Sequence, residues 1–166
     1  MFKTPLINKI SEFIRETGLE IVPAKLDENT FLSGIFIENG KIFVDENKLT
    51  FPGDLLHEAG HLAVAPESLR GQLGDEVFLP DFDMDALEAA AIAWSYAAAL
   101  HLDLNPRVVF HEGGYKGKAE SLLHGFSIGV FIGVNILEKS GMTATGERAE
   151  KLGISPYPKM IKWLAD

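Results

Sequence analysis

The pentapeptide His57-Glu58-Ala59-Gly60-His61 lies inside a segment whose pattern predicts an α-helix. The segment begins after Thr50, a residue type that caps helix starts, and ends at Pro66. Its apolar residues recur at the spacing of one helical face: Leu55, Leu56, Ala59, Leu62 and Ala63. Four residues along a helix advance by about 400° and rise by about 6 Å. We therefore expect His57 and His61 to project from the same face of this helix.

Two imidazoles in this arrangement can close on one metal ion, at metal–nitrogen distances of about 2.0 to 2.1 Å. Glu58 leans to the side of the pair, where a carboxylate can reach a metal-bound water and act as a general base. The chain has no cysteine, which excludes disulfides, thiolate nucleophiles and cysteine-based metal sites. The ligands must then be His, Asp or Glu. We expect Zn2+, although Mn, Fe and Ni accept similar ligands.

A catalytic zinc site needs a third protein ligand and leaves one position for water. Glu88 follows His61 by 27 residues and stands at the start of an alanine-rich helix predicted from Ala86 to about Leu100. It is the last charged residue before the stretch from Ala89 to Leu100, and a lone buried carboxylate is costly without a partner. The Glu88 carboxylate therefore either points into a site or is a first-turn acid favoured by the helix dipole. Three other acids compete as ligands, and one of them is expected to orient a ligand histidine: Asp81, Asp83 and Asp85.

The remaining elements follow from periodicity and turn residues. We expect a first helix over Pro5–Thr17, a β-hairpin over Phe31–Asp45 around Asn39-Gly40, and a loop over Pro66–Pro80. Asp83 or Asp85 caps the third helix and Asn105-Pro106 ends it; a fourth helix covers Ala119–Lys139 and a short final one Pro156–Leu164. The 166 residues, 46% of them apolar, suffice for one core. The predicted fold is α+β: a mostly helical single domain, residues 1–166, with a small antiparallel sheet and a zincin-like active-site helix.

The motif helix after a hairpin, followed by Glu88-Ala89-Ala90-Ala91-Ile92-Ala93, resembles the ImmA/IrrE-type zinc metallopeptidases, a gluzincin-like family. The resemblance covers roughly Gly34 to Trp94. It implies a short sheet, an H-E-x-x-H helix and a following helix that supplies the third ligand. Residue by residue, it implies zinc ligands and one catalytic acid/base: His57, His61 and Glu88, and Glu58.

The helix after Glu88 departs from the family pattern. Ala90 stands where an asparagine is frequent, and Ala97-Ala98-Ala99 replaces the common Leu-Met-Pro ending. These departures leave the implied metal ligands in place but give no basis for carrying over the family's manner of substrate recognition.

Polar residues beside glycines concentrate in Phe110-His111-Glu112-Gly113-Gly114-Tyr115. We interpret this segment as a substrate-binding loop in which His111 or Tyr115 donates a hydrogen bond to the oxyanion of a polarised carbonyl. The alternative is an exposed turn without that role. His101 and His124 lie in apolar helical stretches and are predicted to be buried core histidines outside the site.

Gly125, Gly129 and Gly133 recur every four residues along the predicted fourth helix. Such a stripe lets another backbone approach closely. We expect the alanine face of the third helix to fill it, and the rival interpretation is a glycine-lined seam of a homodimer. That alanine face consists of Ala89, Ala93 and Ala97.

The predicted function is that of a zinc-dependent metallopeptidase acting on a peptide or protein substrate. Two alternatives stay open: a zinc-binding sensor or interaction module without peptidase activity, and an empty site in a purely structural fold. Lys and Arg total 15 against 24 Asp and Glu, a formal charge of −9, which argues against nucleic acid as a partner. The longest uncharged apolar run, Ser121–Leu137, is predicted to be a buried helix, and no secretory signal is visible. We therefore expect no membrane association and a cytoplasmic location.

Overall fold

The structure is a computed structural model and describes residues 1–27, 30–75 and 83–166. In this part of the chain, seven α-helices and one three-stranded sheet follow one another as α1 (Pro5–Glu16), β1 (Glu20–Pro23), β2 (Ile35–Glu38), β3 (Lys41–Val44), α2 (Asp54–Val64), α3 (Glu67–Arg70), α4 (Met84–His101), α5 (Ala119–Ser127), α6 (Val134–Lys139) and α7 (Gly146–Leu152). Two 3-10 turns, η1 (Pro106–Val108) and η2 (Tyr115–Gly117), lie between α4 and α5. The fold class is α+β, as the sequence predicts.

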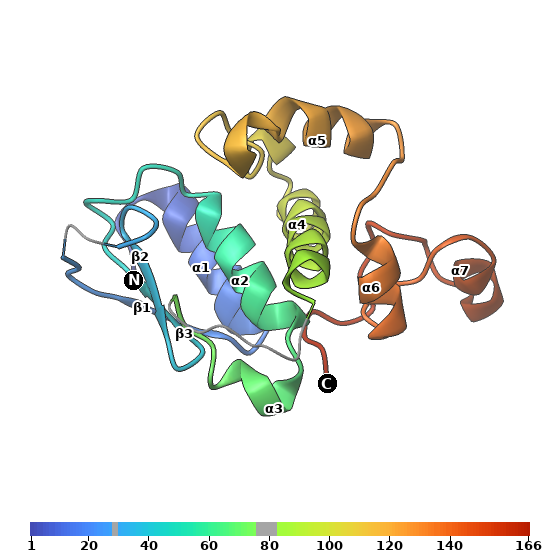
Figure 1. Ribbon diagram of the computed structural model, residues 1–166, viewed down its shortest axis with the longest axis horizontal. Helices are drawn as coiled ribbons and strands as arrows, with labels where there is room; N and C mark the ends of the chain where they lie inside the picture. The colour runs from blue at the N-terminus through green and yellow to red at the C-terminus, as the bar shows by residue number, and fades with distance from the viewer. Residues whose placement is uncertain (28–29, 76–82) are drawn as a thin grey trace.

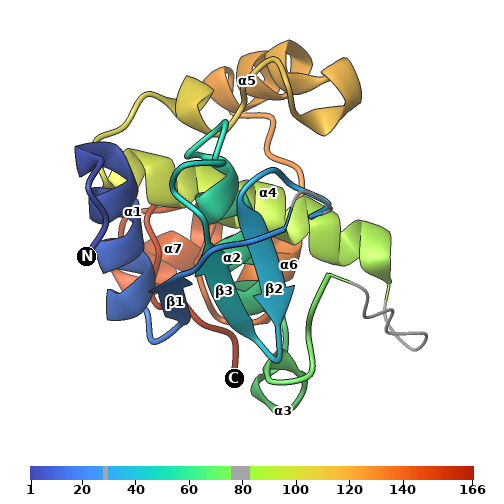
Figure 2. The same ribbon diagram turned by 90° about the vertical axis from the view of Figure 1, so that its left-hand side faces the viewer.

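Helix α2 lies at the centre of the molecule. Figure 1 shows α1 and the sheet on one side of α2 and α4 on the other, with α5 over the upper end of α4 and α6 and α7 on the far side of α4. The turned view places the sheet over α2 and runs α4 behind it (Figure 2). Both central helices are lined with fully buried side chains, among them Leu55, Leu56, Ala93 and Trp94. The elements on either side of the centre therefore share one hydrophobic core.

The sheet is mixed, so the predicted all-antiparallel sheet is wrong. The Asn39-Gly40 turn forms as expected, with φ values of 51° and 72°, and it joins β2 to β3 in antiparallel register. The short strand β1 then pairs with the other edge of β3 in parallel, which gives the order β1-β3-β2. The pairing of β1 depends on contacts with residues about 20 positions away, so local sequence patterns do not reveal it.

The prediction of one continuous helix over residues 119–139 is wrong. The segment forms two helices, α5 and α6, and the residues between them include two glycines in the left-handed conformation, with φ of 82° at Gly129 and 74° at Gly133. The glycines therefore form no stripe on one helix. Only Gly133 lies against α4, where its α-carbon meets the backbone of Ala89, one of the alanines expected there. A β-carbon on Gly129 would meet nothing within 4 Å.

The predicted final helix over residues 156–164 is also wrong. Two prolines in this segment, Pro156 and Pro158, lack the amide hydrogens that a helix interior needs. Met160 pairs with Thr143 in an isolated β-bridge, and the last helix is instead α7. The expected loop over residues 66–80 contains the short helix α3, and its residues 76–80 lie outside the described part of the chain.

His101 and His124 are exposed, so the prediction that they are buried core histidines is wrong. Each lies in the last turn of its helix, α4 and α5 respectively. A basic group is favourable there because the last carbonyls carry partial negative charge.

Among the described residues, no helix combines the length and the apolar character that crossing a bilayer requires.

Candidate metal centre

The site forms where α2 and α4 pack side by side. Gly60 makes the close approach possible, since a β-carbon there would lie only 2.9 Å from the carbonyl oxygen of Ala91. Glu88 precedes Ala91 by three residues and therefore shares the face of α4 that meets α2. Asp83 caps α4, accepting a hydrogen bond of 3.0 Å from the Ala86 amide. The cap fixes the start of the helix and with it the position of Glu88 in the second turn.

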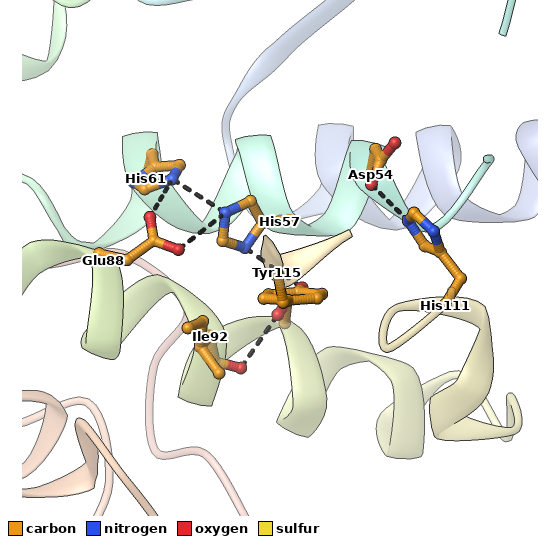
Figure 3. Close-up of polar contacts among 8 residues, drawn as sticks. Asp54, His57, His61, Glu88, Ile92, His111 and Tyr115 are labelled. Atoms are coloured by element: carbon orange, nitrogen blue, oxygen red, sulfur yellow. Dashed lines mark hydrogen bonds and ion pairs between the residues drawn. The ribbon is translucent and has the colours of Figure 1, made fainter. Parts of the chain in front are cut away.

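Figure 3 shows the side chains of His57 and His61 on α2 directed at the carboxylate of Glu88. Nε2 of His61 lies 3.1 Å from Nε2 of His57 and 3.1 Å from Oε2 of Glu88. Nε2 of His57 lies 3.5 Å from Oε1 of Glu88. One ligand atom from each residue lies within 4.8 Å of the other two. The structure thus brings together the three residues that the sequence predicts as ligands, in a group that could hold a metal ion.

These spacings fit a tetrahedral ion. Two atoms bonded to the same zinc at the usual lengths and a tetrahedral angle lie about 3.3 Å apart, close to the three separations above. Two imidazole nitrogens and one carboxylate oxygen are also the donor types that zinc accepts. The Glu88 side chain is 46% exposed, so the cluster opens to solvent on that side and leaves access for a fourth ligand.

The carboxylate and the imidazoles stabilise one another electrostatically. Hydrogen bonds from His57 and His61 hold the pKa of Glu88 far below its usual range. Burial works against the protonated form of His61, but the hydrogen bond to Glu88 and the charges of Glu58 and Glu88 outweigh it and raise the pKa. Glu88 is therefore a carboxylate at neutral pH and offers negative charge to a cation.

Glu58 lies beside this group without belonging to it. Burial raises the pKa of its carboxyl, and the nearby His61 and His57 oppose that rise. The charges of Asp75 and Asp54 raise it further. A carboxylate whose pKa is raised in this way is a better proton acceptor than one in water.

Tyr115 lies on the Nδ1 side of the His57 ring, away from the Nε2 atom that faces Glu88. Its hydroxyl lies 3.5 Å from Nδ1 of His57, which is long for a hydrogen bond. The two rings make an edge contact with centroids 5.4 Å apart. Burial raises the pKa of Tyr115, with smaller contributions from the charges of Asp54 and Glu88, so the phenol stays protonated. The sequence predicts that an aspartate near the start of α4 orients one of the ligand histidines. Asp83 instead caps α4, and Asp81 lies outside the described residues.

His111 contacts α2 about one helical turn before His57. Its Nε2 is 2.7 Å from Oδ1 of Asp54 on the first turn of α2, and its ring stacks on Phe51 with centroids 3.9 Å apart. Its other nitrogen, Nδ1, is buried and has no hydrogen-bond partner in the described structure. Figure 3 shows this pair beside the group of His57, His61 and Glu88, with Tyr115 between the two.

The predicted loop therefore reaches the site by two of its residues, His111 and Tyr115, and their contact with a substrate stays a prediction. Asp54 was not predicted, although it precedes His57 by three residues and so shares its helical face. Ser95, close to Tyr115, carries no sequence signal because a serine in an alanine-rich helix is ordinary. Comparison of the chain with protein-family models, curated proteins and solved structures finds no match.

Proposed function

We propose that this protein is a zinc-dependent metallopeptidase that hydrolyses a peptide or amide bond. The observation that carries the proposal is the convergence of His57, His61 and Glu88 at separations suited to one tetrahedral ion, with the carboxylate of Glu58 beside them. A resemblance to the ImmA/IrrE-type metallopeptidases agrees with this reading and is part of the proposal.

His57 and His61 would hold the ion through Nε2, and Glu88 through a carboxylate oxygen. The ion, when bound, polarises the substrate carbonyl and makes water a stronger nucleophile. The net charge of the ligand set is −1, so the site compensates only part of a divalent charge. The remaining positive charge is available to stabilise an oxyanion.

Glu58 serves as the proton carrier. Its carboxylate accepts a proton from the water molecule whose oxygen adds to the carbonyl carbon. The same group then gives this proton to the departing nitrogen as the C–N bond breaks, which leaves a carboxylic acid and an amine. Burial of Glu58 suits both steps because it brings the pKa closer to the working pH.

His111 and Tyr115 are proposed to border the bound substrate, since their loop comes next to α2 beside the ligands. A neutral phenol or an imidazole there can donate a hydrogen bond to a developing oxyanion.

Replacing Glu58 by Gln tests the proposal, because glutamine keeps the shape of the side chain and removes the proton acceptor. Zinc content is measured by elemental analysis, and hydrolysis with a mixed peptide library read by mass spectrometry. We expect wild type to bind one zinc per chain and to cleave, and Glu58→Gln to bind zinc equally while losing about 10²- to 10⁴-fold in rate. Glu16→Gln is the matched control, because Glu16 is an exposed glutamate at the end of α1 and outside the site. This variant should keep both zinc binding and hydrolysis.

Full hydrolysis by the zinc-loaded Glu58→Gln protein contradicts the assigned role of Glu58. Stoichiometric zinc in a wild-type protein that cleaves no peptide in the library contradicts the peptidase and favours the sensor or interaction module. Absence of stoichiometric zinc after reconstitution contradicts the metal centre itself.

A further inference from the structure

A cavity of about 560 Å³ lies at the C-terminal end of α4. One wall is a single face of this helix, because Ala97, Leu100 and His101 follow one another at the three- and four-residue spacing that shares a helical side. The other wall belongs to residues 155–163, near the end of the chain. Ala97 lies about 14 Å along the helix axis from Glu88. The cavity is therefore separate from the candidate metal centre, and its volume is in the range of pockets that hold small organic molecules.

The wall formed by residues 155–163 is attached to α4 at two points. The Tyr157 hydroxyl donates a hydrogen bond of 2.9 Å to the carbonyl oxygen of Ala93. The indole nitrogen of Trp94 donates another, also of 2.9 Å, to the carbonyl oxygen of Trp163. Both points lie about one turn before Ala97, whose small side chain leaves space beneath the wall. The cavity is thus formed before any ligand binds, which lowers the cost of binding.

Most of the cavity lining is apolar and contains one large ring. The Trp163 indole is held by edge contacts with Phe13 and Trp94, at 4.8 and 5.3 Å between centroids. It is only half-buried by them and contributes to the cavity wall. The apolar lining residues are Ala97, Leu100, Pro156, Pro158, Met160 and Trp163. An aromatic ring gains more from such a wall than its buried area alone provides, because ring pairs attract one another.

The polar lining consists of hydrogen-bond donors. Lys159 carries a positive ammonium group, the His101 imidazole donates a hydrogen bond in either protonation state, and the Ser155 hydroxyl can also donate. The backbone of Lys159 is fixed, since its carbonyl oxygen accepts a hydrogen bond of 2.7 Å from Thr143. Among the described residues, no Asp or Glu lines the cavity, although the chain as a whole has a formal charge of −9. This lining is complementary to an anionic group.

We propose that the cavity binds a small aromatic carboxylate. Its ring lies against Trp163 and the apolar wall, and its carboxylate accepts hydrogen bonds from Lys159 and His101. The inference does not depend on the proposed function, because no residue of the cavity belongs to the metal centre.

The first test is isothermal titration of the full-length protein with 2-naphthylacetate, with and without a metal chelator. We expect one binding site in both conditions. The neutral analogue 2-naphthylacetamide keeps the ring and lacks the charge, so it should bind about 10-fold more weakly. Acetate keeps the charge and lacks the ring, so it should give no measurable binding.

Two variants test the charge of the lining. Lys159→Gln should weaken binding of the carboxylate about 10-fold and leave the amide unchanged. Lys139→Gln is its matched control, an exposed lysine at the end of α6 that does not line the cavity. Leu100→Glu places a negative charge in the lining at a residue that is 39% exposed, and it should weaken the carboxylate more than the amide. Leu152→Glu, at an exposed leucine on α7, should change neither.

Absence of binding overturns the proposal, and so does equal affinity for the carboxylate and the amide. Unchanged affinity in Lys159→Gln overturns it as well, and this variant decides alone should Leu100→Glu fail to fold, because Lys159 is exposed. Binding that disappears when the chelator is added places the carboxylate at the metal centre instead and overturns the cavity site. None of these outcomes depends on zinc content or hydrolysis, so the proposed function stands or fails separately.

Discussion

The α-carbon of Gly133 lies against the backbone of Ala89: a β-carbon added there would be 2.0 Å from the Ala89 carbonyl oxygen. Helix α6 thus begins directly on α4, at the residue that follows Glu88. Gly133 also has a φ of 74°, so both the space and the backbone conformation require glycine at this position.

Gly133→Ala should be strongly destabilising. Overpacking against backbone costs about 1 to 3 kcal/mol, and a left-handed conformation of alanine costs about 1 to 2 kcal/mol. Gly129→Ala is the matched comparison, because its φ of 82° is left-handed but nothing lies within 4 Å of the added carbon; it should cost only about 1 to 2 kcal/mol. Urea unfolding measures both. Equal losses would contradict the packing of α6 on α4.

Gly60→Ala should separate α2 from α4. Alanine is the better helix former by about 1 kcal/mol, but its methyl group would lie 2.9 Å from the Ala91 carbonyl oxygen and must push the helices apart. We expect a net loss of about 1 to 3 kcal/mol in unfolding free energy, together with weaker zinc binding. Gly71→Ala, whose methyl group would meet nothing within 4 Å, serves as the control. A Gly60→Ala protein as stable as wild type would show that the crossing is looser than described.

Glu88→Gln should weaken zinc binding by more than the 10- to 100-fold typical of residues that only support a ligand, about 100-fold or beyond. The reason is that an amide oxygen carries no charge to offset that of the ion. Asp85→Asn, an exposed acid in the first turn of the same helix, should leave the affinity unchanged. Isothermal titration with Zn2+ measures both. A larger loss of zinc affinity in Asp85→Asn than in Glu88→Gln would show that Glu88 is not the third ligand.

Glu46 provides a pH-dependent contact outside the site. It accepts a hydrogen bond of 2.9 Å from the Lys3 amide and another from that of Thr4, just before α1. The hydrogen bond from the Lys3 amide, followed by those from Thr4, lowers the pKa of the Glu46 carboxyl from its ordinary value. A lowered pKa stabilises the folded state above the unfolded-state value, and this stabilisation is lost as the pH falls through the folded-state value.

The stability curves of wild type and Glu46→Gln should therefore differ at pH 6 and converge in acid. Chemical denaturation between about pH 3 and pH 7 measures this. A constant difference across the whole range would show that the charge of Glu46 has no part in the contact.

Features decided by neighbours in sequence were predicted well. The ends of α1, the Asn39-Gly40 turn and the cap at Asp83 agree with the structure within a few residues, because each depends on the intrinsic preferences of nearby residues. The predicted start of α2 at Thr50 is less accurate, since the helix begins at Asp54 after a turn that contains Pro52.

Features decided by distant contacts were not predicted. The strand β1 exists because β3 offers it a parallel edge, and α5 ends because glycines adopt left-handed conformations that sequence spacing does not reveal. The same division holds in the site. The spacing of His57 and His61 is local to one helix, and Glu88 was inferred from its place before a buried helix. The partners of His111 and Tyr115 come from other elements, so only the folded chain shows them.

His61 and Glu88 stand on separate helices, 27 residues apart in a chain without cysteine. An ion shared by them would tie a long loop closed, much as a covalent cross-link does, and would restrict the unfolded chain while it stays attached. Unlike a cross-link, this tether comes and goes with the supply of metal. Removal of the metal should therefore weaken the packing of α2 against α4 and also abolish any reaction at the site.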